Sequence, residues 1–312
     1  MGKHYLWKRL GQMIIVLFGV SFLTFLLTYI APGDPATAMY DAMGIVPTEE
    51  MLANARTAMG LDQPFLVQYW IWLSNCLQGD FGVSFSKNQT VLELLSSRLW
   101  PTLRLSLLSL AFMLLLSVPV GIYSAVKQNR LADYIVRGCA FVGTSMPEFW
   151  MGLLLMYWFA LKLNILPVIS SGTGFSQLIL PAVTLAITMA AKYTRQVRTA
   201  VLEELNQDYV TGARARGLKE SRVLFCHVLP NALLPLVTML GLSLGYLLGG
   251  TAVVEIIFSY PGLGYLAVTA AEARDYPLIQ GFVLWIATIY MILNLLVDFS
   301  YHLIDPRIRE VS

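Results

Sequence analysis

The chain has 312 residues, of which 57% are hydrophobic and only 13% are charged. Soluble globular domains average about 25% charged residues, so this composition excludes an ordinary soluble domain and favours a membrane protein. The net charge of +2 says little by itself. The three cysteines lie in separate segments, without the spacing of a disulfide framework or a metal site.

The first apolar run follows a basic N-terminus. Lys3, Lys8 and Arg9 precede residues 10–30, which carry no charge. A helix rises about 1.5 Å per residue, so a run of this length crosses a hydrocarbon core of about 30 Å. It is too long for the core of a cleaved signal peptide, and no small-residue cleavage site follows it. We therefore expect a retained first span over residues 9–30.

Residues 31–100 have a different character. They contain seven acidic and three basic side chains, which favours an insertion on the outer side of the membrane. Within it, residues 48–59 are predicted to form a short helix, with Thr48 as N-cap and two glutamates in the first turn. Residues 68–76 are predicted to form an amphipathic, Trp-rich helix near the membrane interface.

Five further apolar stretches complete the pattern. Spans are predicted over residues 102–126, 135–163 (interrupted by Pro147), 178–200, 232–258 and 278–302. Basic residues gather in the connections expected inside: Lys127, Arg130 and Arg137, the seven from Lys192 to Arg222, and Arg307 and Arg309. The positive-inside rule then places both termini in the cytoplasm. The predicted fold is an all-α membrane protein, one domain of six transmembrane helices with a cytoplasmic loop over residues 201–231.

Polar residues within the apolar runs are candidates for a translocation pathway, because ionisable groups there are costly and usually face a cavity or a partner. Glu148 follows Pro147, which frees a backbone carbonyl and kinks a helix. For Asp298, near the inner end of the sixth span, a structural ion pair explains the charge equally well. The full candidate set is Ser145, Pro147, Glu148, Glu255, Asn294 and Asp298.

Glycines recur every four residues in the fifth span, at Gly241, Gly245 and Gly249. This spacing permits close helix packing, either within one subunit or against a second one. The GxSxG pattern at residues 241–245 lies in an apolar helix, where it is not expected to supply a nucleophile. The sequence has no GxxxxGK[ST] motif for binding phosphates and no HExxH motif, so no catalytic residue and no metal ligand is assigned.

The longest polar interval of the second half runs over residues 208–231 and is strongly basic. Two short helices are predicted, residues 209–216 and 220–229, joined at Gly217 because glycine tolerates positive φ. Its sequence, YVTGARARGL at 209–218 and HVLPNA at 227–232, resembles the coupling loop of binding-protein-dependent ABC importer permeases. Thr211 and Gly212 depart from the commoner Arg-Thr of that family.

The resemblance extends along the whole chain and is closest to the dipeptide/oligopeptide/nickel branch. Further matches are PGDP at 32–35, GLDQP at 60–64, DFGVS at 80–84, SMP at 145–147, ILPA at 179–182, EIIFSYPGLG at 255–264, RDYP at 274–277 and DPRIR at 305–309. The resemblance implies a type I ABC importer permease fold with a cytoplasmic coupling helix. The residues it implies for coupling to an ATPase are Tyr209, Ala213, Arg214, Ala215, Arg216, Gly217 and Leu218.

The resemblance also implies the protein's partners. They are a second, homologous permease subunit, two ATPase subunits that bind ATP and Mg²⁺, an extracytoplasmic binding protein and the lipid bilayer of the bacterial inner membrane; no nucleic acid and no cofactor in this chain are implied. Nickel or a metal chelate is the first expectation for cargo, because the sequence looks closest to nickel-type permeases. A dipeptide or oligopeptide is the alternative. Glu148 departs from the Asn that is usual at its position, and this departure leaves open a metal chelate or a short peptide. From the residues alone, a secondary transporter or channel stays open as another class.

Overall fold

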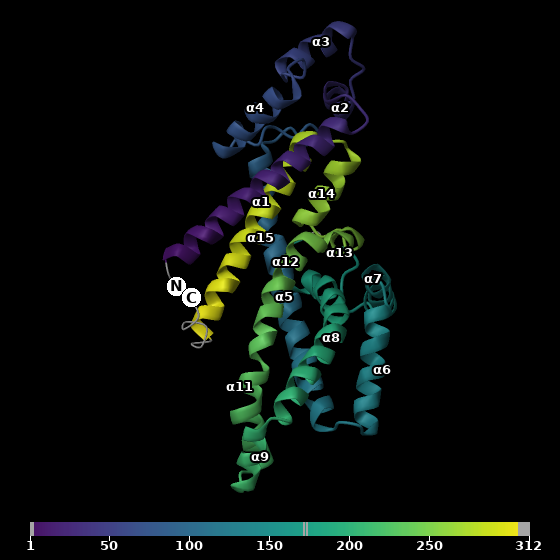
Figure 1. The fold of residues 1–312 in the computed structure, drawn as a ribbon. Helices are drawn as coiled ribbons and strands as arrows, with labels where there is room; N and C mark the ends of the chain where they lie inside the picture. Colours follow the sequence, from purple (N-terminus) through teal and green to yellow (C-terminus); the bar gives the residue numbers. More distant parts are fainter. Residues whose placement is uncertain (1–2, 171, 173, 305–312) are drawn as a thin grey trace. The chain divides into compact units, whose positions relative to one another are not determined.

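The computed structural model describes residues 3–170, 172 and 174–304, and within these residues the regular elements are all helical (Figure 1). The chain divides into two compact units. Unit 1 comprises the residues up to Thr102 together with Pro261–Leu296, and unit 2 comprises Leu103–Tyr260 and the described residues from Val297 on. The long helices α5 and α15 each contribute to both units.

Unit 1 is built on the first helix and the segment that follows it. Its elements are α1 (Lys3–Ile30), α2 (Pro35–Ala42), α3 (Glu49–Ala58), α4 (Phe65–Leu77), the start of α5 (Val91–Val126), α14 (Leu263–Glu272) and most of α15 (Tyr276–Ile304). Helices α2–α4 gather at one end of α1 (Figure 1). Aromatic rings join α1 to α4: Phe22 and Phe25 lie 5.4 and 5.7 Å from the ring of buried Tyr69.

The short helices of unit 1 begin where local chemistry predicts. The hydroxyl of Thr48 accepts a hydrogen bond from the backbone N–H of Met51 at 3.3 Å, which confirms the predicted N-cap of α3. A contact that the sequence did not reveal involves Asp275, which is fully buried. Its carboxylate accepts bonds from the hydroxyls of Ser84 (2.6 Å) and Ser86 (2.8 Å), and so anchors the loop before α5 beside the start of α15.

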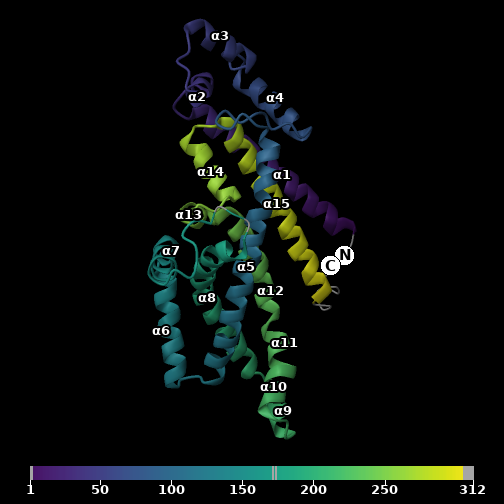
Figure 2. The same cartoon turned by 180° about the vertical axis from the view of Figure 1, so that it is seen from behind.

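Unit 2 is organised around α8, a long helix whose buried side chains enter two apolar clusters. Its elements are α6 (Leu131–Ser145), α7 (Glu148–Leu155), η1 (Met156–Lys162), α8 (Phe175–Leu205), α9 (Asp208–Ala215), α10 (Glu220–Val223), η2 (Leu224–Val228), α11 (Leu229–Ala232), α12 (Leu234–Gly250) and α13 (Ala252–Ile257). Leu185 belongs to one cluster and Val197 to the other. Helices α9 and α10 form one tip of this unit, opposite α7 and α13 (Figure 2).

Four helices of the described residues are long and apolar enough to cross a membrane: Trp7–Ile30, Val91–Val126, Phe175–Leu205 and Tyr276–Val297. The third predicted span is instead a pair of helices that meet at 104°, and it makes a fifth span if the pair is counted as one. The bend falls at Pro147, which cannot donate to a helix and disfavours helical geometry in the residue before it.

The fifth predicted span is also divided. Helix α12 ends at Gly250 and α13 begins at Ala252. Helix α12 has 17 residues, fewer than the about 20 that a transmembrane helix needs. Two consecutive glycines have low helix propensity, which explains the break where the apolar pattern itself is continuous.

Candidate functional site

The tip of unit 2 is shaped by the C-terminal cap of α9. Gly217 has φ +79°, as predicted from the sequence. Its N–H donates to the carbonyl of Arg214 at 2.9 Å, and the N–H of Leu218 donates to the carbonyl of Ala213 at 3.3 Å. This pair of bonds is a Schellman motif, which satisfies the last carbonyls of α9 and fixes the direction in which the chain leaves it.

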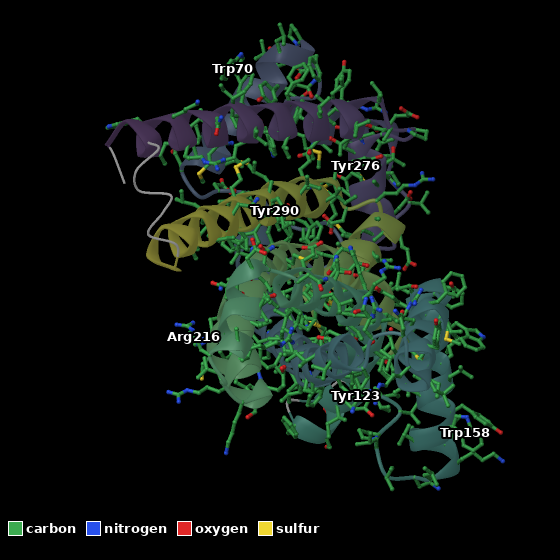
Figure 3. The ribbon with its side chains drawn as sticks, turned by 60° about the horizontal axis from the view of Figure 1, so that its bottom comes forward. Trp70, Tyr123, Trp158, Arg216, Tyr276 and Tyr290 are labelled. Carbon is green, nitrogen blue, oxygen red and sulfur yellow. The ribbon has the colours of Figure 1, made fainter. Side chains whose placement is uncertain are left out.

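Helix α9 has a buried face and an exposed face. Val210 and Ala213 are completely buried and pack with Val201 of α8 in one apolar cluster. Ala213, expected to be a coupling residue, therefore supports the tip from inside, and Leu218 is half-buried beside the same cluster. Of the predicted coupling residues, the exposed ones are Tyr209, Arg214, Ala215, Arg216 and Gly217. Figure 3 shows the side chain of Arg216 projecting away from the ribbon.

Polar contacts tie the tip together. Arg214 forms a two-bond ion pair with Glu220 of α10, at 2.8 and 3.2 Å. Because both side chains are exposed, this pair adds little stability. The Tyr209 hydroxyl donates to Glu204 at 2.5 Å and accepts from the side-chain amide of Asn231 at 3.3 Å. Burial and then the bond to Glu204 raise the pKa of Tyr209, so the phenol stays protonated and joins the end of α8 to α9.

A buried ion pair lies on the same helix, α8, that leads into the tip. Asp133 of α6 is fully buried and accepts two bonds from Arg198 of α8, at 2.6 and 2.7 Å. The Ser124 hydroxyl and the Asn129 N–H also donate to this carboxylate, at 2.6 and 3.0 Å. All of these donors together compensate the burial of the charge. The pair clamps α5, α6 and α8 beside one another.

A cavity of about 390 Å³ opens between α7, α8 and α12 of unit 2, and it is called the α8 cavity below. Glu148 lines it from the first turn of α7, and its carboxylate accepts a hydrogen bond of 3.0 Å from the hydroxyl of Tyr246 on α12. Lys192 lines it from α8. On the same wall, the Tyr193 hydroxyl donates to the carbonyl of Met239 at 2.5 Å and also contacts the Ser243 hydroxyl.

Of the five candidate pathway residues whose side chains the structure describes, only Glu148 lines this cavity. Ser145 and Pro147 are exposed at the bend before α7. Glu255 is fully buried on α13 and accepts a 2.9 Å bond from Thr251, so it does not line the cavity. Asn294 lies on the part of α15 that belongs to unit 1. The side chain of Asp298 lies outside the described residues.

The other polar residues of the α8 cavity were not among the residues predicted from the sequence to line a pathway. Lys192 entered it only as one of the basic residues that set orientation, and Ser243 only as part of a rejected nucleophile pattern. One feature of the sequence could have pointed to Lys192. It directly follows an uncharged, largely apolar run that ends in two alanines, so its charge lies at the end of a predicted span. Its juxtaposition with Glu148, which lies on another helix, is a product of tertiary packing and has no counterpart in the local sequence.

The glycine face of α12 packs partly within the chain. A Cβ added at Gly241 would collide with the side chain of Val297 on α15. Gly245 is buried and Gly249 is exposed. Close packing is therefore used at Gly241 inside this subunit, whereas Gly249 remains available to a neighbour.

Unit 1 holds a larger cavity, of about 930 Å³, beside α2–α4. An ion pair stands at its wall: Arg56 donates to Asp34 at 2.9 and 3.1 Å. Burial opposes ionisation of Asp34, but the hydrogen bonds from Arg56 and Thr37 and the charge of Arg56 outweigh it and hold the pKa of that carboxyl below its usual value. Among the described residues, no group of three or more His, Cys, Asp or Glu side chains is placed to hold a metal ion.

Comparison with known proteins covers nearly the whole chain. Residues 117–310 match the family described as binding-protein-dependent transport system inner membrane component, and residues 2–107 match its N-terminal membrane component. The probable peptide ABC transporter permease protein y4tP of Sinorhizobium fredii is 40% identical over 312 residues, covering 98% of this chain and 99% of the relative. The glutathione transport system permease protein GsiC of Escherichia coli strain K12 is 40% identical over 306 residues, with the same coverage.

Solved structures show the same fold. A chain of the MetNI methionine ABC transporter, in an inward-facing conformation, aligns with a TM-score of 0.56 at 20% identity, over 68% of this chain and 96% of that one. A chain of an amino acid ABC transporter crystallised with histidines aligns with a TM-score of 0.51 at 19% identity, over 69% and 94%. The chain therefore belongs to the binding-protein-dependent transport system inner membrane components, as a non-catalytic, multi-pass ABC importer permease of the dipeptide/oligopeptide branch.

Proposed function

We propose that the chain forms half of the translocation pathway of an importer for short peptides. The proposed cargo is supported by the similarity, along almost the full length of both chains, to permeases named for peptide and glutathione transport. Nickel, the first expectation from the sequence, receives no such support from these relatives. The remaining parts of the importer are a related permease, two ATPase subunits that bind ATP and Mg²⁺, and an extracytoplasmic binding protein.

The tip formed by α9 and α10 is the proposed docking element for an ATPase subunit. Its exposed face carries the guanidinium groups of Arg214 and Arg216, while its inner face is packed on α8. This arrangement suits a rigid, basic surface element that moves together with a docked partner. The proposed topology puts the tip and both termini in the cytoplasm and residues 31–100 outside, in accordance with the positive-inside rule.

The proposed cycle is alternating access. The binding protein delivers a peptide to the outer face, ATP closes the ATPase dimer, and the tip moves with the ATPases. Because α8 continues almost directly into α9, movement of the tip carries the helix that lines the α8 cavity. The chain itself makes and breaks no covalent bond.

Transport by the complete importer tests the proposal. The complex is reconstituted in proteoliposomes with its binding protein, and ATP-dependent accumulation of labelled dialanine and of nickel is measured in parallel. We expect dialanine to accumulate only with ATP, and nickel to stay at the level of protein-free vesicles. ATP-dependent accumulation of nickel without that of any di- or tripeptide would overturn the proposed cargo.

A further inference from the structure

We propose that the α8 cavity is a cargo site that recognises the two charged ends of a short peptide, with Glu148 receiving the ammonium group and Lys192 the carboxylate. This inference rests on the proposed function and adds the residues and the chemistry by which the pathway contacts its cargo. The cavity volume of about 390 Å³ falls within the range of about 300–1,000 Å³ that is typical of small-molecule sites.

The charges of the cavity come from two different helices. Glu148 begins α7 and Lys192 lies in the middle of α8, and both line the same cavity. Within the part of the chain that the structure describes, neither takes part in an ion pair. Ionisable groups in a membrane domain are costly unless they meet water, a partner or a ligand. An acid and a base that share one cavity without pairing fit a ligand that carries both opposite charges.

The hydrogen bonds of the walls determine which groups remain available to a ligand. Tyr246 uses its hydroxyl proton on the Glu148 carboxylate, and Tyr193 uses its proton on the Met239 carbonyl. In its contact with Tyr193, Ser243 must then be the donor, because a hydroxyl has only one proton. The oxygens near Glu148 are left as acceptors, which suits an ammonium group with three N–H donors. Lys192 supplies the complementary donor for a carboxylate.

The remaining wall is apolar and adaptable. Met189, Met239 and Leu242 line the cavity between its polar groups. Methionine is flexible and polarizable, so it packs against side chains of different shapes. Such a site binds the charged termini of a peptide specifically and accepts different peptide side chains against its apolar wall. It would therefore select zwitterionic peptides as a class rather than one peptide sequence.

The test compares peptides with blocked ends. Proteoliposomes holding the complete importer receive dialanine, N-acetyl-dialanine or dialanine amide, each at a concentration that saturates the binding protein, as checked separately by its tryptophan fluorescence. The variants are Glu148→Gln and Lys192→Met. The matched controls are Glu203→Gln, an exposed residue of α8, and Lys162→Met, which lies over the ring of Tyr157 outside the cavity.

Because the binding protein is the same in every experiment, the ratio of variant to wild-type uptake reports only the effect of the substitution in the permease. Hydrogen bonds to charged groups are strong, so each cavity variant should lower dialanine uptake by at least about tenfold. Glu148→Gln should leave N-acetyl-dialanine uptake unchanged, and Lys192→Met should leave dialanine amide uptake unchanged. Lys192→Arg, which keeps the charge, should restore most dialanine uptake. Neither control should alter any ratio.

Three results would overturn the inference. One is wild-type dialanine uptake in both cavity variants. Another is an equal loss of uptake for all three peptides, which would indicate a structural role. The third is a loss of the second permease from the purified complex with normal uptake per assembled complex, which would show that the charges pair with that subunit. Each of these leaves the proposed function intact, provided that the wild-type importer accumulates dialanine; the absence of that accumulation is the separate failure of the proposed function.

Discussion

The cap of α9 offers a sharp test of the docking role proposed for the tip, because Gly217 combines a restrictive backbone with free space. Its φ of +79° lies in the left-handed region, yet a Cβ at this position would meet no atom within 4 Å. Gly217→Val is therefore penalised by conformation alone. A non-glycine residue in this region costs about 1–2 kcal/mol, and a β-branched one stands at the upper end.

The chain can avoid this cost only by giving up the cap. Leaving the left-handed region breaks the bonds from the Gly217 and Leu218 N–H groups, each worth about 0.5–1.5 kcal/mol. Either route costs about 1–3 kcal/mol, which is small beside the roughly 5–15 kcal/mol that stabilises a folded domain. We expect Gly217→Val to insert and fold, but to present α9 and α10 at an altered angle.

The assay is copurification of the ATPase subunits together with peptide-stimulated ATP hydrolysis in reconstituted membranes. Gly217→Val should lose stimulated hydrolysis, either because the ATPases detach or because they dock at a wrong angle. Gly217→Asn is the matched control, since asparagine already adopts this conformation in the chain at Asn88, Asn129 and Asn164, with φ of 51°, 59° and 52°. Normal copurification and hydrolysis in Gly217→Val would refute the role assigned to this cap.

Three further predictions concern packing and charge. A Cβ at Gly143 would lie 2.8 Å from that of Ala191 on α8, so Gly143→Ala should destabilise the complex by about 1–3 kcal/mol in thermal melting, whereas Gly138→Ala on the same helix, with open space, should not. Asp133→Asn leaves its arginine partner uncompensated and should cost about 3–5 kcal/mol by the same measurement. The pKa of Asp34 is lower in the folded protein than in the unfolded chain, so its contribution to stability is complete above the unfolded pKa and is lost as the pH falls through the folded pKa. At a pH below about 4 the melting temperature should therefore decrease, and it should decrease less in Asp34→Asn.

Features that depend on neighbouring residues were predictable from the sequence. The N-cap at Thr48 and the positive φ at Gly217 follow from short-range backbone chemistry, and both are found in the structure. The bend at Pro147 was predictable in place, but not in its size of 104°, because a proline removes a bond without setting the angle at which packing holds the two helices.

Features that depend on distant residues were not predictable. Asp133 and Arg198 are 65 residues apart, and Glu148 and Tyr246 are 98 apart. The periodicity of residues within one helix does not predict contacts between residues so far apart in the sequence. The positive-inside rule uses every basic residue near a span only to predict the orientation of the protein in the membrane. Lys192 was therefore counted with the topology signals. Its place in the α8 cavity emerged only once α7, α8 and α12 were packed together.

One helix connects the two proposed functional regions of unit 2. Lys192 and Leu205, the last residue of α8, are separated by about 20 Å at 1.5 Å per residue, and α9 begins three residues later. Between them, Arg198 is held by the buried carboxylate of Asp133, so this stretch of α8 cannot rotate alone without carrying α6 or breaking a costly ion pair. Force applied at the tip would therefore move Lys192 and α6 as one body, while Glu148 lies beyond the bend that ends α6. If the tip docks an ATPase as proposed, we expect its movement to change the distance between the two charges of the cavity, and a peptide that bridges them to be released by that change.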